Sequence, residues 1–180
     1  MPFFIIPNAI FTGWGTLVFF DHKEVEISDE GSDHVSKIPK LKPHWKIQFQ
    51  FRPVCTNLGA KRIYPVSMRV FHMKQLLLKI DFPSRPPHTR LVHGDAAPIL
   101  GPAPPSGEWS KILVSYEKSE QEEGKATLAL ALSDEEVGRV EVDEVKLDSG
   151  IKIFIGPESA YSYDMDIPVG YIRELIVLDM

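Results

Sequence analysis

Apolar and polar residues alternate with a period of two through much of this chain, and this alternation restricts the fold more than any other feature. Residues 44–52 carry a large apolar side chain at every second position: Trp45, Ile47, Phe49 and Phe51. Residues 75–82 repeat the pattern with Leu76, Leu78, Ile80 and Phe82. Residues 125–132 repeat it with Ala126, Leu128, Leu130 and Leu132. Successive side chains of a β-strand point to opposite faces, so each segment predicts a strand with one buried and one solvated face.

Further short segments have the β-branched and aromatic content of strands: residues 16–20, 24–28, 63–71, 111–117, 138–142, 151–155 and 171–178. Helical periodicity is almost absent. About ten strands without helices predict an all-β fold, a two-sheet antiparallel β-sandwich of the jelly-roll type. We expect a single domain over residues 1–180, with Ile153 and Ile155 among its core residues. Residues 83–107 form a proline-rich loop with a short edge strand at 89–93, and residues 157–168 form a second long loop.

Composition excludes several classes of function. The formal net charge is -5 and the pI is about 5.7, which argues against nucleic acid as the main partner. No run reaches the ~20 apolar residues of a membrane-spanning helix, so we expect no membrane insertion. Cys55 is the only cysteine, so a disulfide could only link two chains into a homo-oligomer. The apolar N-terminus does not resemble a signal peptide. These features fit export without a signal, or a module of a longer extracellular protein, slightly better than a cytoplasmic protein.

Four segments carry a resemblance to a known superfamily. Residues 107–114 are similar to a strand opening of the form G-x-W-x-x-hydrophobic, and residues 126–137 to a hairpin L-x-V-D-G-x-x-V. Residues 151–156 are similar to a strand hydrophobic-x-hydrophobic-G, and residues 169–175 to a closing strand F-x-G-x-I-R-x-L. In this order they resemble the concanavalin A-like lectin/glucanase superfamily, and its laminin-G-like jelly-roll domains in particular. The resemblance implies a concanavalin-like β-sandwich and a lectin-like, carbohydrate-binding function.

The chain also departs from that pattern. The glycine of the hairpin is replaced by Glu135 or Glu136, and the closing-strand cysteine of laminin-G-like domains by Tyr171 or Ile172. The disulfide that is usual in those domains is therefore missing. The sequence contains neither an H-x-N-x-R strand nor a W-G-x-E-x-R segment, so the resemblance does not extend to galactose binding of the galectin type.

The polar positions of the alternating strands form one candidate binding surface. Gln48, Gln50 and Arg52 would lie beside Ser67, Arg69, Lys79 and Asp81 if their strands are neighbours. Amides, guanidinium groups and a carboxylate offer the mixed donors and acceptors that sugar hydroxyls need. The alternative is an ordinary solvated outer face of an antiparallel sheet.

The long loops and Trp109 form a second candidate. An exposed indole can stack on a sugar ring, although the burial tendency of tryptophan and the family position both favour a core role for Trp109. We expect a binding rim with the following side chains: Arg90, His93, Tyr161 and Tyr163. Glu158, Asp164 and Asp166 offer the oxygen ligands that calcium takes, so a calcium ion could bind here; no other cofactor is expected.

Paired carboxylates on one strand would suggest a glycosidase. Glu141 and Asp143 share a strand face. The resemblance would also require a carboxylate at position 146, which is Lys146. We therefore interpret the chain as a lectin-like domain without catalytic activity that binds a glycan or glycoprotein. The alternatives are a laminin-G-like protein-interaction and adhesion module and, last, a glycan-active hydrolase.

Overall fold

The computed structural model describes residues 9–11, 17–19, 37–38, 43–53, 66–82, 88–147, 151–157 and 170–179. Within these ranges all regular structure is β-strand and every strand pair is antiparallel. No helix in this part of the chain is long and apolar enough to cross a membrane. The expected strand at residues 24–28 lies outside the described ranges.

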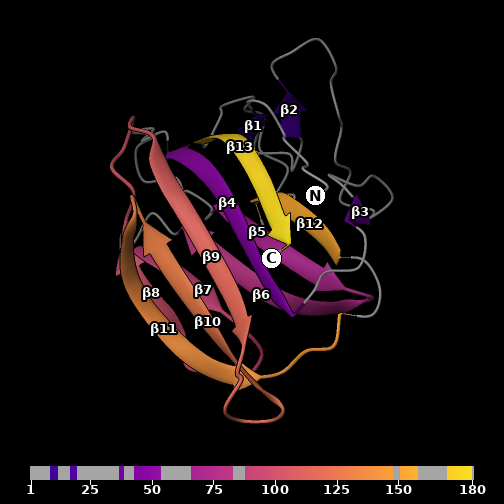
Figure 1. The fold of residues 1–180 in the computed structure, drawn as a ribbon. Coiled ribbons are helices and arrows are strands. Elements are labelled where there is room, and N and C mark those ends of the chain that lie inside the picture. The colour runs from indigo at the N-terminus through magenta and orange to yellow at the C-terminus, as the bar shows by residue number, and fades with distance from the viewer. Residues whose placement is uncertain are drawn as a thin grey trace.

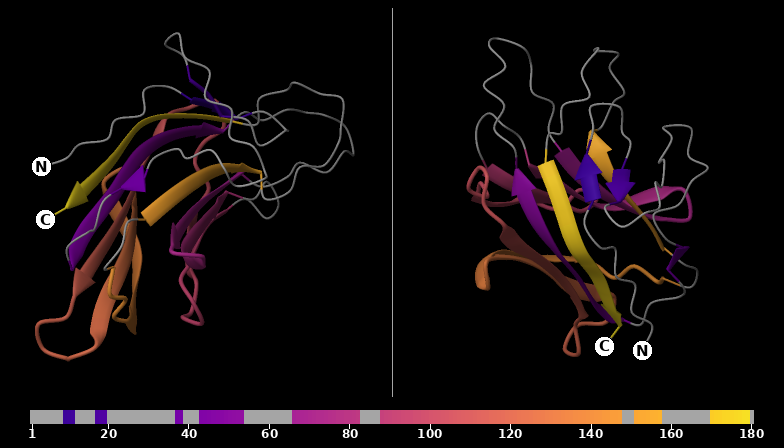
Figure 2. Two further views of the ribbon diagram at one scale, coloured as in Figure 1. Left: turned by 90° about the vertical axis from the view of Figure 1, so that its right-hand side faces the viewer. Right: turned by 90° about the horizontal axis from the view of Figure 1, so that it is seen from above.

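The described strands form two sheets (Figure 1). One sheet has seven strands in the order β11 (Glu135–Asp143), β10 (Lys125–Leu132), β9 (Ser110–Lys118), β4 (His44–Pro53), β13 (Gly170–Asp179), β1 (Ala9–Phe11) and β2 (Leu17–Phe19). The other has six strands in the order β3 (Lys37–Ile38), β12 (Ile151–Pro157), β5 (Val66–His72), β6 (Gln75–Phe82), β7 (His88–Val92) and β8 (Ile99–Pro102). Strand β4 lies between β9 and β13, whereas its sequence neighbours β3 and β5 lie in the other sheet. The sheets form the two layers of the predicted antiparallel sandwich (Figure 2).

The core lies between the two sheets and contains the residues that alternation predicts to be buried. Eight of the expected core residues are almost completely buried: Trp45, Phe49, Phe51, Leu78, Ile80, Leu128, Leu130 and Ile153. The side chain of Ile155 lies outside the described residues. Aromatic rings join the layers, since Phe82 of β6 stacks on Phe51 of β4 at 4.4 Å between ring centroids. Such pairs stabilise a core beyond the area that they bury.

Strand β6 departs from strict alternation. A β-bulge in its pairing with β5 makes Val70 the partner of Leu78 and Phe71 the partner of Leu76. Leu77 is the extra residue, and it is buried, whereas Leu76 is 46% exposed. The prediction that Leu76 faces the core is therefore wrong, because one inserted residue reverses the face of every residue before it.

The proline-rich segment is more regular than expected. It contains two strands, β7 and β8, and β8 rather than residues 89–93 lies at the edge of the six-stranded sheet. Strand β8 packs against β11 of the other sheet, where a Cβ atom on Gly138 would lie only 2.8 Å from Cγ2 of Ile99. A glycine at position 138 thus allows the two sheets to approach closely at this side of the sandwich.

Candidate functional site

The predicted polar stripe is divided between the two sheets. Ser67, Arg69, Lys79 and Asp81 do face one another across β5 and β6, where Ser67 pairs with Asp81 and Arg69 with Lys79. Strand β4, however, pairs with β9 and β13 in the other sheet. Since Trp45, Phe49 and Phe51 point into the core, Gln48, Gln50 and Arg52 point away from it, and Arg69 lies on the opposite side of the sandwich. The condition for one continuous stripe, that these strands are neighbours, is therefore not met.

Trp109 lies immediately before β9 on the outer face of the seven-stranded sheet. It is partly exposed, while the next residue, Ser110, is 4% exposed and faces the core. The Cζ atom of Arg52 lies 4.9 Å from the centroid of the Trp109 ring, and that of Arg173 lies 4.2 Å from it. The expectation that Trp109 is a core residue is wrong: two guanidinium groups contact its ring instead of core side chains.

Strand β13 supplies the other half of this cluster. Tyr171 pairs with Arg52 and Arg173 with Gln50, so both side chains lie beside the polar face of β4. The guanidinium of Arg52 also lies over the Tyr171 ring, with 4.5 Å from Cζ to the centroid. Cation–π contacts of this kind contribute about 0.5–1 kcal/mol each at exposed sites. Arg52 is thus held by aromatic rings from two other parts of the chain.

A β-bulge in β13 explains why the adjacent residues Arg173 and Glu174 reach the same outer face of the sheet. Ile172 and Leu175 are both buried although they are three residues apart, which uniform alternation forbids. The register accommodates them, because Arg173 pairs with Gln50 and Ile176 with Gln48, leaving one extra residue opposite Phe49. Glu174 has a φ of 55°, in the left-handed region that costs an L-residue roughly 1–2 kcal/mol.

Gln50 connects the two side chains that the bulge brings together. Its Oε1 atom accepts hydrogen bonds from Nε and Nη2 of Arg173, at 2.9 and 2.6 Å. Its Nε2 atom donates a hydrogen bond of 2.6 Å to Oε2 of Glu174. We call the assembly the arginine–tryptophan cluster and define it by these residues: Gln50, Arg52, Trp109, Tyr171, Arg173 and Glu174.

The outer face next to the cluster is lined by smaller side chains. Gln48 pairs with Leu113 on β9, and Leu113 pairs with Ala131 on β10. Ser115 and Ala129 form the next pair along the same two strands. All of these side chains are partly exposed and uncharged, and they are bordered by Lys46 on β4 and by the ion pair of Arg139 and Glu136 on β11.

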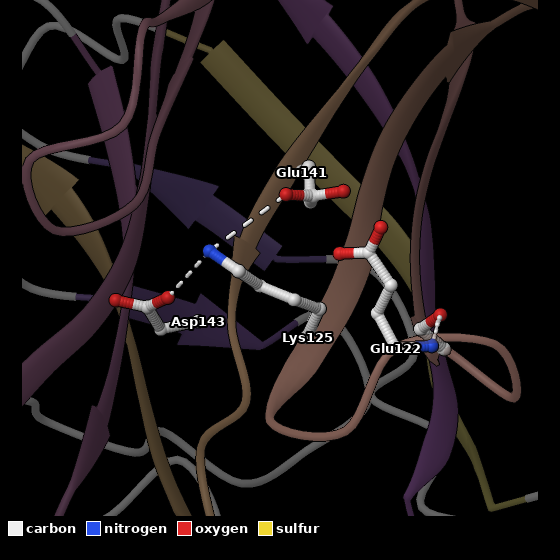
Figure 3. A network of polar contacts seen from close by, with 5 residues as sticks. Glu122, Lys125, Glu141 and Asp143 are labelled. Carbon is white, nitrogen blue, oxygen red and sulfur yellow. Dashed lines mark hydrogen bonds and ion pairs between the residues drawn. The ribbon is translucent and has the colours of Figure 1, made fainter.

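At the far end of the same face, acidic side chains form ion pairs with Lys125 (Figure 3). The Nζ atom of Lys125 on β10 lies 3.0 Å from Oδ1 of Asp143 and 3.7 Å from Oε1 of Glu141, both on β11. The hydrogen bond from Lys125 to Asp143 raises the pKa of Lys125, and the Asp143 charge adds to this effect. Glu141 and Asp143 do share a face, as expected. Both are ion-paired to one exposed lysine, so their geometry fits a surface salt-bridge network better than an acid–base pair.

The predicted rim residues are separated. Arg90 is exposed on β7 and pairs with Asp81, which places it on the outer face of the six-stranded sheet. His93 lies after β7 with its Nε2 atom buried and without a hydrogen-bond partner. Burial lowers the pKa of His93, while a hydrogen bond with its own backbone and the charge of Asp143 oppose that shift.

The other rim residues cannot be placed. Tyr161, Tyr163, Glu158, Asp164 and Asp166 lie outside the described residues. Within the described ranges, no group of three or more His, Cys, Asp or Glu side chains could hold a metal ion. A calcium site at the loop therefore remains a prediction from the sequence.

Sequence reasoning identified half of the arginine–tryptophan cluster. Gln50, Arg52 and Trp109 were candidate ligand-binding residues, and the structure brings them together. Tyr171, Arg173 and Glu174 were noted only in the closing-strand pattern. The sequence feature that could have identified them is the three-residue spacing of Ile172 and Leu175. This spacing conflicts with alternation and so indicates a bulge. No local sequence pattern predicts that β13 pairs with β4.

Comparisons with known proteins agree with this architecture. No protein-family model matches the sequence, and no curated protein is significantly similar to it. Among solved structures, the VIP36 exoplasmic/lumenal domain in its Ca2+/Man-bound form has a TM-score of 0.55 at 13% identity, over 100% of this chain and 84% of that chain. An alginate lyase Aly36B mutant in complex with alginate trisaccharide has a TM-score of 0.50 at 9% identity, over 99% and 81%.

A Trypanosoma rangeli sialidase mutant with trans-sialidase activity has a TM-score of 0.50 at 8% identity, and the match covers 76% of this chain but 20% of the sialidase. Identities this low define the fold alone. The shared fold is a two-sheet antiparallel β-sandwich, the architecture that the alternating strands predicted.

Proposed function

We propose that this protein is a non-catalytic, lectin-like domain that binds carbohydrate at the arginine–tryptophan cluster. The observation that carries the proposal is the collection of two aromatic rings, two guanidinium groups, an amide and a carboxylate on one face of one sheet. Guanidinium, amide and carboxylate groups make paired hydrogen bonds to adjacent hydroxyls. Aromatic side chains offer apolar surface to a sugar ring.

The rigidity of the cluster supports this assignment. Its residues lie on or beside paired strands, and the side chain of Gln50 is already hydrogen-bonded to those of Arg173 and Glu174. A site that is ordered before binding loses little entropy when a weak ligand arrives. Of the proteins with similar folds, the VIP36 domain was solved in a Ca2+/Man-bound form and the Aly36B mutant in complex with alginate trisaccharide. Both are compatible with a glycan or glycoprotein partner here. An extracellular or exoplasmic setting and calcium at the loop of residues 157–168 belong to the same proposal.

A glycan array read with and without calcium tests the function. Variants Arg173→Gln and Arg69→Gln provide a matched pair, because both arginines are partly exposed on strands but lie on different sheets. We expect Arg173→Gln to lose binding and Arg69→Gln to keep it. If only Arg69→Gln loses binding, the site lies on the opposite sheet. If Asp164→Ala alone abolishes a calcium-dependent signal, the site is the loop. Silence of the wild-type protein on the array would refute the proposal.

A protein-interaction module of the laminin-G-like kind is the second candidate, and exposed apolar side chains favour it. Met73 and Leu76 at the β5–β6 hairpin are 63% and 46% exposed, and Leu100 on β8 is 58% exposed. Exposed apolar side chains of this size can take part in a protein interface. Substitution of Met73 and Leu76 by serine would abolish binding to a partner chain while leaving glycan binding intact, so the two functions are separable.

A further inference from the structure

The arginine–tryptophan cluster has more positive than negative charge. It contains two guanidinium groups and one carboxylate, Glu174, which already accepts a hydrogen bond from Gln50. The neighbouring cation, Lys111, is ion-paired to Asp134 at 2.6 Å. Among the described residues, the contacts of Arg52 are with two ring faces and with no carboxylate. Arg173 likewise contacts Gln50 and the Trp109 ring rather than a carboxylate, so the cluster holds two guanidinium charges against one carboxylate.

The geometry of Arg52 suits an anionic ligand. A cation–π contact does not consume the N–H donors of a guanidinium, so the donors of Arg52 stay available to a ligand. Those donors match the two oxygens of a carboxylate in a bidentate pair, which is stronger than a hydrogen bond between neutral groups. Arg173, by contrast, directs Nε and Nη2 at Gln50 and has less capacity left for a ligand.

The charge pattern of the face indicates which end would receive such a ligand. Glu117, Glu141 and Asp143 are exposed on outward-facing positions of β9 and β11, at the end of these strands remote from Trp109. The protein as a whole has a formal net charge of -5. An anionic group would be disfavoured at the acidic end and stabilised at the end that holds Arg52 and Arg173, with neutral sugar units on the uncharged side chains between the two ends.

We infer that the ligand is an acidic glycan, and that Arg52 binds the carboxylate of one of its sugar residues. Trp109 and Tyr171 hold the Arg52 guanidinium in place, and Gln50 positions Arg173 beside it. This inference rests on the proposed carbohydrate-binding function and names the substrate class of the same site.

Titration calorimetry with a short oligouronate and with the same oligosaccharide after chemical reduction of its carboxyl groups tests the inference. We expect the acidic form to bind at least about tenfold more tightly, a difference that a single charge-assisted bidentate pair can supply. Its affinity should fall as salt is added. Arg52→Gln should remove the preference for the acidic form, and Arg52→Lys should restore little of it, because lysine lacks the planar fork.

Arg139→Gln is the matched control. Arg139 lies on the outer face of the same sheet, is exposed, and forms a bidentate ion pair with Glu136. Equal losses in Arg139→Gln and Arg52→Gln would reveal a general charge effect and overturn the inference. Binding of the neutral oligosaccharide as tightly as the acidic one would also overturn it while leaving the carbohydrate-binding function standing. If neither form binds and the glycan array is silent, both proposals fail.

Discussion

Deletion of Glu174 is the most direct test of the bulge that builds the arginine–tryptophan cluster. The register pairs Arg173 with Gln50 and Ile176 with Gln48, so without Glu174 the buried Leu175 would simply pair with Phe49. Every inward-facing residue of β13 would remain inward-facing. The deletion relieves a left-handed backbone conformation worth roughly 1–2 kcal/mol and loses one exposed hydrogen bond worth about 1 kcal/mol. We expect the free energy of unfolding to stay within about 2 kcal/mol of the wild-type value.

Deletion of Leu175 is the matched control for that experiment. It shortens the strand by the same single residue, but it places the carboxylate of Glu174 where Leu175 was buried. The loss of a buried leucine costs about 2–5 kcal/mol, and burial of an unpaired carboxylate costs several kcal/mol more. Urea denaturation of the three proteins, with linear extrapolation to water, measures both effects. If deletion of Glu174 unfolds the protein, or deletion of Leu175 leaves it as stable as the wild type, the bulge is not where the register places it.

Three further predictions concern the core, the contact between the sheets and the partly buried His93. Leu128→Ala and Ile153→Ala should each lower the free energy of unfolding by about 2–5 kcal/mol, and unchanged melting temperatures would contradict the assignment of their strand faces. Gly138→Ala should cost about 1–3 kcal/mol, because its Cβ atom would approach Cγ2 of Ile99 to 2.8 Å; denaturation with and without Ile99→Ala should show a smaller cost in the second background. His93 has a folded-state pKa below its ordinary value of 6.5, so the unfolded chain binds more protons and stability should fall as the pH drops below about 6.5. Melting curves between pH 7.5 and 5 should show a smaller loss in His93→Gln, and an equal loss in both proteins would refute this effect of burial.

Alternation was sufficient to predict the fold and most of the core. Buried and partly exposed positions alternate throughout β10 and over residues 44–52 of β4, so the period alone assigns Trp45 and Leu128 to the core. The same rule failed for Leu76, because a bulge in β6 is set by the pairing with β5 and not by the local sequence. Strand faces can thus be predicted up to the first bulge. The expectation of one domain over residues 1–180 remains a prediction.

Strand neighbours could not be predicted in the same way. The candidate polar stripe required residues 44–52 to be neighbours of residues 63–71 and 75–82. They lie in different sheets because β4 pairs with β9 and β13, and the hydrogen bonds of Gln50 reach residues 123 and 124 positions away. Antiparallel pairing of distant segments depends on the packing of the whole sandwich, and one sequence contains no local record of it.

The bulge in β13 links strand alternation and strand pairing to the proposed function. A regular strand presents every second side chain to a given face, so adjacent residues such as Arg173 and Glu174 would be on opposite sides of the sheet. One extra residue in a left-handed conformation allows both to reach Gln50, at an energetic cost that the sheet must offset elsewhere. Strained backbone that persists in a well-packed strand is more common at functional sites than elsewhere. Because the bulge breaks the period of two, alternation alone does not predict that Arg173 and Glu174 share a face. The three-residue spacing of the buried Ile172 and Leu175 is the pattern by which a similar site could be recognised in another chain of this fold.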